Sequence, residues 1–279
     1  MKHQLPFFEM MATNVCNLSC QGCTTFSDLQ HSGYMTWAEA REEIIPWMER
    51  VEFQAFGFMG GEPLINPYIN DWIVGVRELL PNTQIRFITN GILLEKNWWV
   101  VDLLDQVGNS ELKISQHITD QRITDAVSRM FREYELEPVH EHGIKNRYRT
   151  PSGLRFQVKV PDTFIQTFQG TYETMSPHDN TPKDAFDICV QKNCPMLYQG
   201  RLWKCGTAAL TQEVVERHGR PNWDEWQPYF DTGISPNCED SVLEAFIRNF
   251  GQPHTMCRQC PSKDNIESRF DHSKTVKFK

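Results

Sequence analysis

The sequence predicts an α/β fold with a parallel sheet over the first two thirds of the chain and a small cysteine-rich module after it. Strand and helix patterns alternate up to about Pro161, as they do in parallel sheets with crossover helices. Loops rich in cysteine and glycine follow two expected strands, and sites in such sheets gather at the strand ends. A second set of cysteines begins at Cys189, where the alternation has stopped.

The composition indicates a globular protein that is not built for a membrane. The 279 residues are 39% hydrophobic and 23% charged, enough for one large domain and a small appendage. No apolar run approaches the ~20 residues that a membrane-spanning helix needs. Pro6 and Glu9 interrupt the N-terminal apolar run, unlike a signal peptide. The net charge of −8 argues against broad binding to nucleic acid or anionic membranes.

The cysteine content favours cofactor ligands over disulfides. Nine cysteines occur in clusters, a pattern typical of ligands in a reducing compartment. We therefore expect a cytoplasmic protein.

The individual elements follow from apolar periodicity and from start and stop signals. Thr36 and Glu39 form a capping box before a helix over 37–50, which Pro46 is expected to kink or divide. Pro67 opens a second helix that Pro81 ends. The expected strands are 6–12, 53–59, 84–89, 112–118, 136–140 and 154–160, and the expected helices are 37–50, 67–80, 94–107 and 120–134.

Three cysteines stand at C-x3-C-x2-C spacing directly after the first expected strand. They are Cys16, Cys20 and Cys23. A loop leaving a strand end can wrap three thiolates around one face of a 4Fe–4S cluster, which normally takes four cysteine ligands. Because no fourth cysteine lies nearby, one iron would stay open for another ligand. Three buried free thiols or part of a zinc site are the alternatives, although structural zinc prefers paired C-x2-C units.

With a second motif the chain resembles the radical S-adenosylmethionine (SAM) superfamily. Gly60-Gly61-Glu62-Pro63 follows the second expected strand and matches the family's GGEP motif, whose backbone and Glu side chain hold the amino group of SAM. Glycines allow close backbone approach to a ligand and a carboxylate suits an ammonium group, although Gly-Gly after a strand is often just a turn. The position before the third cysteine, often aromatic in the family, is Gly22 here.

The resemblance implies a partial (β/α)6 barrel over 1–160 with a 4Fe–4S cluster whose open iron binds SAM. It also implies a flavodoxin- or ferredoxin-type reductant. Ser115 stands where the family places contacts to the SAM ribose, with a plain hydrogen-bonded hydroxyl as the alternative. Asn90 resembles the family's third-strand end, although an Asn-Gly turn explains it equally. His117 fits a hydrogen-bonded core or cap histidine better than a functional one.

The second cysteine set resembles the C-terminal "twitch" module, the half-size relative of the SPASM domain. After a bridging segment at 161–188, this module would occupy 189–279. Gly200 to Cys205 supplies its G-x4-C pattern, and Cys257 with Cys260 its C-x2-C pattern. The resemblance implies one auxiliary 4Fe–4S cluster, and its first ligand is either Cys189 or Cys194. A four-cysteine zinc knuckle has similar spacing and is the alternative.

Two other features of this region have plainer expectations. Cys238 is expected to be a bystander thiol. Core packing explains the aromatic residues of the module better than a substrate pocket does, because aromatic side chains dominate burial. These residues are Trp203, Trp223, Trp226, Tyr229 and Phe230.

A basic stretch before the module predicts an anion site. Residues 144–161 contain five basic residues and no acidic one. Arg155 and Lys159 differ by four, so a strand would place both on one face, facing an anionic group of the substrate or the SAM carboxylate. A solvated basic surface is the alternative.

The activity implied by the resemblance is reductive cleavage of SAM and hydrogen abstraction from a substrate carbon. The outcome would be oxidation or cross-linking of a small molecule or peptide, with SAM consumed and the auxiliary cluster accepting an electron. An isomerase or mutase that regenerates SAM and acts on a nucleotide or an amino-acid-bearing substrate is the first alternative. A non-catalytic iron–sulfur or zinc protein is the second, and the intact Glu62 speaks against it.

Overall fold

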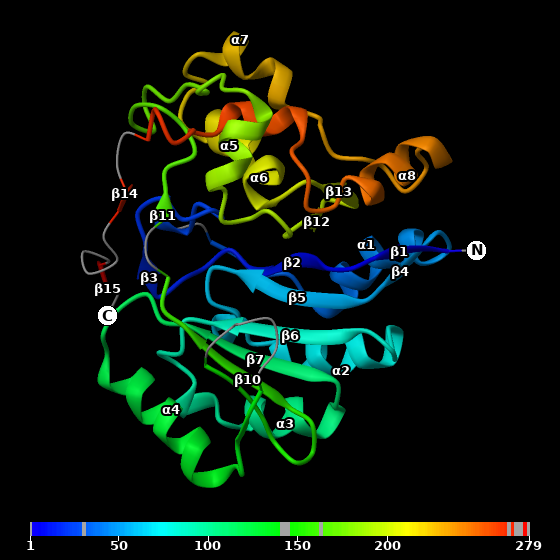
Figure 1. The fold of residues 1–279 in the computed structure, drawn as a ribbon, viewed down its shortest axis with the longest axis vertical. Coiled ribbons are helices and arrows are strands. Elements are labelled where there is room, and N and C mark those ends of the chain that lie inside the picture. Colours follow the sequence, from blue (N-terminus) through cyan, green and yellow to red (C-terminus); the bar gives the residue numbers. More distant parts are fainter. Residues whose placement is uncertain are drawn as a thin grey trace.

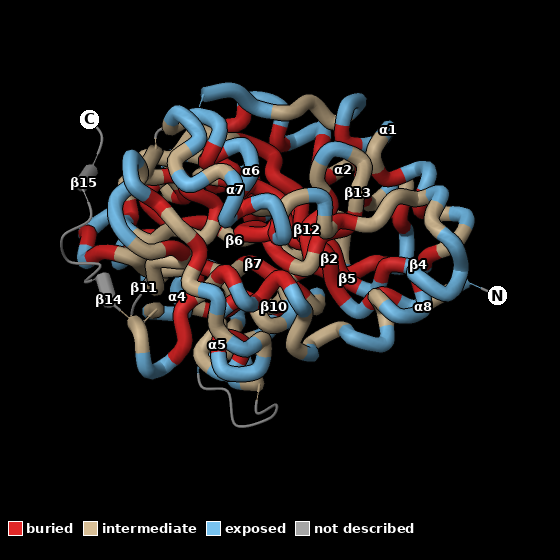
Figure 2. The backbone as a smooth tube through the Cα atoms, turned by 90° about the horizontal axis from the view of Figure 1, so that it is seen from above, coloured by how far each residue is buried: buried red, intermediate tan, exposed pale blue. Residues whose placement is uncertain are grey.

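The computed structural model describes residues 2–29, 32–139, 146–161, 164–266, 269–270 and 276–277. A central sheet organises them, with the C-terminal helices gathered beyond one edge of the sheet and α4 near the opposite end (Figure 1). Buried backbone follows the central strands through the molecule (Figure 2).

In the described part of the chain the main sheet has nine strands in the order β13-β12-β2-β5-β6-β7-β10-β9-β8. The segment β2-β5-β6-β7-β10 is parallel throughout, and β12 adds to β2 in parallel. The strands are β2 (Phe8–Thr13), β5 (Ala55–Gly60), β6 (Gln84–Thr89), β7 (Ser110–Ser115), β8 (Glu137–Pro138), β9 (Arg147–Arg149), β10 (Arg155–Lys159), β12 (Met196–Tyr198) and β13 (Arg201–Trp203). The mixed α/β content agrees with the sequence, and the sixfold barrel repeat stays a prediction.

Six short strands form small pairs outside this sheet. The pairs are β1 (His3–Leu5) with β4 (Val51–Phe53), β11 (Phe164–Ile165) with β14 (Arg269–Phe270), and β3 (Leu18–Ser19) with β15 (Val276–Lys277). The last pair puts the chain's C-terminal residues beside the loop that carries the first three cysteines.

The helices between the parallel strands end within two residues of the predicted positions. Three of them also begin there, whereas the helix expected at 94–107 begins at Trp99, after a 3-10 turn. The helices are α1 (Trp37–Met48), α2 (Ile69–Leu79), α3 (Trp99–Val107) and α4 (Gln121–Glu133), with the 3-10 turns η1 (Ser27–Leu29), η2 (Pro63–Ile65) and η3 (Glu95–Asn97). The predicted capping box at Thr36 and Glu39 is confirmed, and Pro46 stays inside α1 without dividing it. The apolar faces of these helices pack against the sheet in one core.

Three further expected elements differ from the structure. The strand expected at 112–118 is β7, which starts two residues earlier and ends at Ser115. The strand expected at 136–140 is reduced to the short antiparallel β8, and residue 140 lies outside the described part. The bridging segment contains the helix α5 (Pro182–Ile188), which Thr181 caps through its hydroxyl, so it is more ordered than a loop.

The C-terminal part is joined to the sheet by the hairpin β12–β13, as the Gly200 turn predicts. Its further helices are α6 (Gly206–Arg217), α7 (Trp223–Trp226) and α8 (Asp240–Arg248), with η4 (Gln227–Tyr229) and η5 (Thr255–Gln259). A second hydrophobic cluster holds this part together. The aromatic residues named above belong to it or pack against it, as expected. The predicted domain boundaries stay predictions. The hairpin β12–β13 belongs to the predicted C-terminal module, yet it continues the main sheet.

Within the described ranges, none of the helices has the length and apolar character that crossing a membrane requires.

Candidate active site

A cavity of about 410 Å³ lies at the carboxyl ends of the parallel strands and is called the strand-end cavity below. It collects most of the site residues predicted from the sequence: Cys16, Cys20, Cys23, Gly60, Gly61, Asn90, Ser115 and Cys194. These residues come from five separate segments, so the tertiary structure brings them together as the strand-end rule predicts. His117 lines the same cavity.

The three cysteines lie on the loop that leaves β2. Cys20 is buried and the other two are half-buried. The backbone N–H of Leu18 donates to the Cys16 sulfur over 3.4 Å, a contact of the kind that stabilises thiolate ligands of iron–sulfur clusters. Burial is the main cause that raises the pKa of Cys16, with the Glu62 charge second. A metal that binds here would therefore displace a proton.

Gly22 has a positive φ of 70°. This left-handed conformation favours glycine over the aromatic residue that is common in the family. The departure from the family pattern thus has a backbone cause.

Gly60 and Gly61 allow the GGEP turn to lie against the backbone that precedes Cys16. The N–H groups of Gly61 and Glu62 donate to the carbonyls of Thr13 and Val15 over 2.9 and 2.8 Å. A Cβ on either glycine would come within 2.0 Å of one of these oxygens. The glycines therefore join the two motifs directly, in addition to lining the cavity.

The Glu62 side chain is fully buried and does not line the cavity. Its carboxylate accepts hydrogen bonds from the Thr89 hydroxyl (2.7 Å), the Asn90 N–H (2.7 Å) and the Leu64 N–H (3.2 Å). Burial raises the pKa of Glu62 to about 7, and the three hydrogen bonds oppose that rise. The carboxylate thus ties the GGEP turn to the end of β6, and its contact with SAM stays a prediction.

We expect Glu62→Gln to keep its iron content but to lose stability and bind SAM less tightly. An amide nitrogen would face donors that now meet a carboxylate, which costs about 1–3 kcal/mol in unfolding free energy. Loss of a charge-assisted bond to SAM would weaken binding by about one to two decades. Anaerobic urea unfolding and SAM titration measure the two effects, with the exposed Glu78→Gln as control. An unchanged SAM affinity would mean that the motif acts only as a turn.

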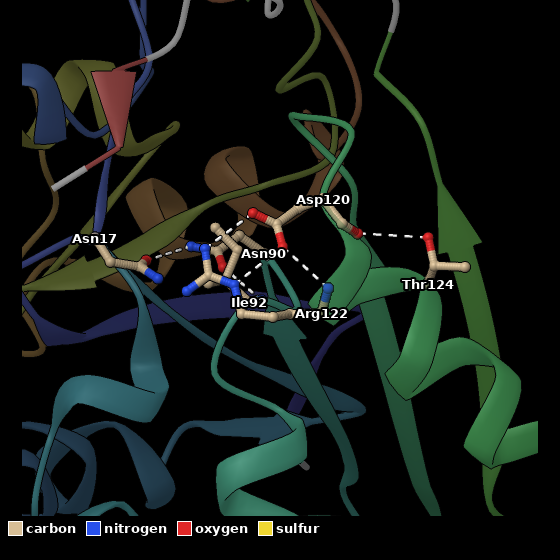
Figure 3. Close-up of polar contacts among 6 residues, drawn as sticks. All are labelled: Asn17, Asn90, Ile92, Asp120, Arg122 and Thr124. Atoms are coloured by element: carbon tan, nitrogen blue, oxygen red, sulfur yellow. Dashed lines mark hydrogen bonds and ion pairs between the residues drawn. The ribbon is translucent and has the colours of Figure 1, made fainter. Parts of the chain in front are cut away.

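Asn90 connects the end of β6 to the cysteine loop. Its amide nitrogen donates to the Asn17 side-chain oxygen over 2.7 Å, and its own oxygen accepts from the Ile92 N–H over 3.0 Å. Figure 3 shows this bridge together with Asp120, which caps α4 and pairs with Arg122 over 2.9 Å. Asn90 is buried and forms part of the cavity wall.

The expected basic pair is separated by the fold. Lys159 lines the strand-end cavity, whereas Arg155 lines a separate small cavity with Arg86 and Glu111 at the other end of the strands. Four residues of strand span about 13 Å, so a shared face does not mean a shared site. The expectation that Arg155 and Lys159 act together was wrong. Lys145, in the same basic stretch, lies outside the described residues.

Four of the C-terminal cysteines line a second, small cavity, called the thiol pocket below. They are Cys189, Cys205, Cys257 and Cys260. Backbone N–H groups donate to two of the sulfurs: Gln191 to Cys189 over 3.3 Å and His254 to Cys257 over 3.4 Å. Burial is the main cause that raises the pKa of Cys205, to about 12. Lys204, which also lines this pocket, opposes that rise.

Cys194 lies apart from the thiol pocket, in the strand-end cavity. It is a hydrogen-bonding neighbour of the Glu9 carboxylate, and the Glu9 charge helps to raise the pKa of the thiol after burial. A nearby carboxylate disfavours a thiolate. The structure thus separates the two cysteines that the sequence left as alternatives.

Sequence reasoning missed Glu9 and Lys113, which also line the strand-end cavity. Glu9 is a charged residue inside the largely apolar strand β2, whereas β7 alternates polar and apolar residues and also carries Glu111, so only Glu9 contrasts with its strand. That contrast is a signal the sequence carried, because ionised side chains rarely point into a sheet core unless paired or functional.

Within the described ranges, no group of three or more His, Cys, Asp or Glu side chains is set to hold a single metal ion. Cysteine spacing, a shared cavity and N–H···S contacts are the features of these cysteines that fit cluster ligands.

Part of the chain is similar in sequence to known proteins. A curated relative, an S-adenosylmethionine-dependent nucleotide dehydratase from Flammeovirga pacifica, is 26% identical over 149 residues, 48% of this chain and 49% of the relative. A GTP 3′,8-cyclase from Nostoc sp. is 28% identical over 130 residues, 45% of this chain and 38% of that protein. The chain thus spans half or less of the length of these relatives.

A solved structure covers more of the chain. The crystal structure of BtrN in complex with AdoMet and 2-DOIA aligns over 99% of this chain and 100% of its own, with a TM-score of 0.54 and 14% identity. At this identity the likeness concerns the fold alone. The family model of the radical SAM superfamily matches residues 10–150, a range that includes the cysteine triad, the GGEP turn, most of β2 and all of β5, β6 and β7. The chain therefore belongs to the radical SAM superfamily.

Proposed function

We propose that this chain binds a 4Fe–4S cluster through Cys16, Cys20 and Cys23 and uses it to cleave SAM reductively. The observation that carries the proposal is that the three cysteines share one cavity with Gly60 and Gly61. When bound, the cluster and SAM would supply a 5′-deoxyadenosyl radical that abstracts hydrogen from a substrate carbon.

The chain's own residues fit this role. Cys16, Cys20 and Cys23 would hold three irons and leave the fourth to SAM. Gly60 and Gly61 present bare backbone to the cavity, so the methionine end of SAM can approach closely. The buried contacts of Glu62 and Asn90 hold the GGEP turn, the end of β6 and the cysteine loop in one arrangement.

We further propose that the thiol pocket binds an auxiliary 4Fe–4S cluster through Cys189, Cys205, Cys257 and Cys260. Their common cavity and the N–H donors aimed at Cys189 and Cys257 support this set. On this basis the module is twitch-like, and the cluster would accept an electron from the substrate. A zinc site on the same cysteines is the alternative, and iron analysis distinguishes them.

Two observations bear on the substrate class. Oxidation of a small molecule or peptide with consumption of SAM is the outcome that an auxiliary redox centre favours. The names of the curated relatives, a nucleotide dehydratase and a GTP 3′,8-cyclase, favour a nucleotide substrate. A redox-neutral reaction that regenerates SAM is the competing outcome.

Anaerobic incubation with SAM and a strong reductant tests the function. We expect 5′-deoxyadenosine and methionine to form, and their absence from cluster-loaded protein would refute the proposal. With a deuterated substrate, deuterium in accumulating 5′-deoxyadenosine indicates consumption of SAM. Deuterium returned to product, with many turnovers per SAM, indicates an isomerase instead.

A further inference from the structure

Two lysines and a serine form one wall of the strand-end cavity, called the cationic wall below because of the two lysines. Lys113 and Ser115 lie on β7, and Lys159 lies on the neighbouring strand β10, where it stands directly opposite Ser115. Lys113 stands opposite Gln157, two residues before Lys159. Because side chains alternate along a strand, the three residues share one face, and all three line the cavity.

Within the described residues, neither lysine makes a direct ion pair or a side-chain hydrogen bond. Lys113 is only half-buried by accessible surface, but burial is the main cause that lowers its pKa, followed by the Lys159 charge. The Glu111 and Glu9 carboxylates oppose that lowering without forming an ion pair with Lys113. Two ammonium groups that face one cavity without a direct ion pair form a site that an anion would stabilise.

Glu9 on β2 also lines this cavity. Its side chain is 3% exposed, and one carboxylate oxygen, Oε2, is buried with no hydrogen-bond partner in the described part of the chain. Gly57 leaves space for it, since a Cβ there would lie 3.1 Å from the Glu9 Cγ. Glu9 and Lys113 interact electrostatically, but the ion pairs among the described residues do not include them. An unpaired buried acceptor is costly, so a donor group of a ligand would stabilise it.

We propose that Lys113 and Lys159 bind an oxoanion group of the substrate, a phosphate or a carboxylate, and that Glu9 accepts a hydrogen bond from a hydroxyl or amino group of the same molecule. Ser115, opposite Lys159, keeps its expected contact with the SAM ribose. The inference rests on the proposed function, because it places the substrate beside the SAM site. Lys113 lies two residues before the end of β7, about 7 Å deeper than the strand ends. The GGEP turn, by contrast, lies at the end of β5. Lys159 ends β10 and so lies at the level of the strand ends, but β6 separates β7 and β10 from β5. The position across the sheet, together with the depth of Lys113, separates the oxoanion site from the expected methionine end of SAM.

Anion binding to the anaerobic, cluster-loaded protein tests the proposal without turnover. Inorganic pyrophosphate and malonate serve as the phosphate and carboxylate probes, titrated calorimetrically with SAM present, and SAM affinity and iron content are measured on the same samples. Lys113→Gln and Lys159→Gln should each weaken the binding of the preferred probe about 10- to 100-fold, as expected for loss of a charge-assisted contact. SAM affinity should stay within about twofold. Lys96→Gln, an exposed lysine on η3, is the matched control.

Glu9→Gln gives a result of the opposite sign. Removing the carboxylate that interacts with Lys113 should strengthen binding of the anion probe, whereas a merely structural role of these residues would weaken it in all three variants. If Lys113→Gln fails to fold, the exposed Lys159 still tests the site.

The outcomes separate the possible sources of the anion. Tighter binding of pyrophosphate identifies a phosphate group, and tighter binding of malonate a carboxylate. If neither probe binds, or if the lysine variants lose SAM affinity and keep anion binding, the proposal is wrong. A protein that holds iron but does not bind SAM at all would refute the proposed function instead.

Discussion

Replacing Cys16, Cys20 and Cys23 together with alanine should lower the iron content of the anaerobically purified protein from about eight to about four atoms per chain and abolish SAM cleavage. The reason is that the three thiols line one cavity and belong to one loop. Cys194 also lines this cavity, but one thiol beside the Glu9 carboxylate cannot replace three ligands. Iron and sulfide analysis measures the first effect, and 5′-deoxyadenosine formation measures the second.

Cys238→Ala is the control for this experiment. Cys238 lines neither cavity and sits beside Arg50, whose guanidinium donates to the Cys238 carbonyl over 2.7 Å. We expect this variant to retain its iron and its activity. Full iron loading in the triple variant would remove the N-terminal cluster from the assignment and leave the cysteines as buried thiols.

Cys189→Ala should remove the auxiliary cluster, about four irons per chain, while Cys194→Ala should keep it. Cys189 shares the thiol pocket with the three other candidate ligands and receives the Gln191 N–H. Cys194 instead neighbours the Glu9 carboxylate, which disfavours the thiolate that a metal needs. Iron analysis with electron paramagnetic resonance of the reduced protein distinguishes the two variants.

The pair serves as its own control, because both cysteines are half-buried and only five residues apart. Loss of iron from Cys194→Ala and not from Cys189→Ala would reverse the ligand assignment. Retention of zinc and no iron in the wild-type thiol pocket would instead support the zinc alternative.

Local sequence signals determined most of the α/β framework. The capping box at Thr36 and the strand 84–89 follow the predicted residues, because caps and apolar periodicity act within a few residues of each other. The same holds for the glycine turn that carries Gly60 and Gly61. The cysteine triad and this turn each follow a parallel strand, and the carboxyl ends of parallel strands meet at one edge of the sheet. The location of the strand-end cavity was therefore predictable from the sequence.

The pairing of distant residues was decided by tertiary structure. The separation of Cys189 from Cys194 depends on β12, which joins β2 and brings Met196 opposite Glu9. The cationic wall depends on the register between β7 and β10, which sets Lys159 opposite Ser115.

Arg155 shows the limit of strand periodicity. Strand periodicity predicted the face of the sheet on which Arg155 lies, but not its position along the strand. That position places Arg155 in a small cavity at the other end of the strands, away from the strand-end cavity. Sequence by itself therefore determined which elements form and which of their ends carry the chemistry. Only the packed chain decided which side chains meet, because register and strand order are set by contacts between segments that lie far apart in the sequence.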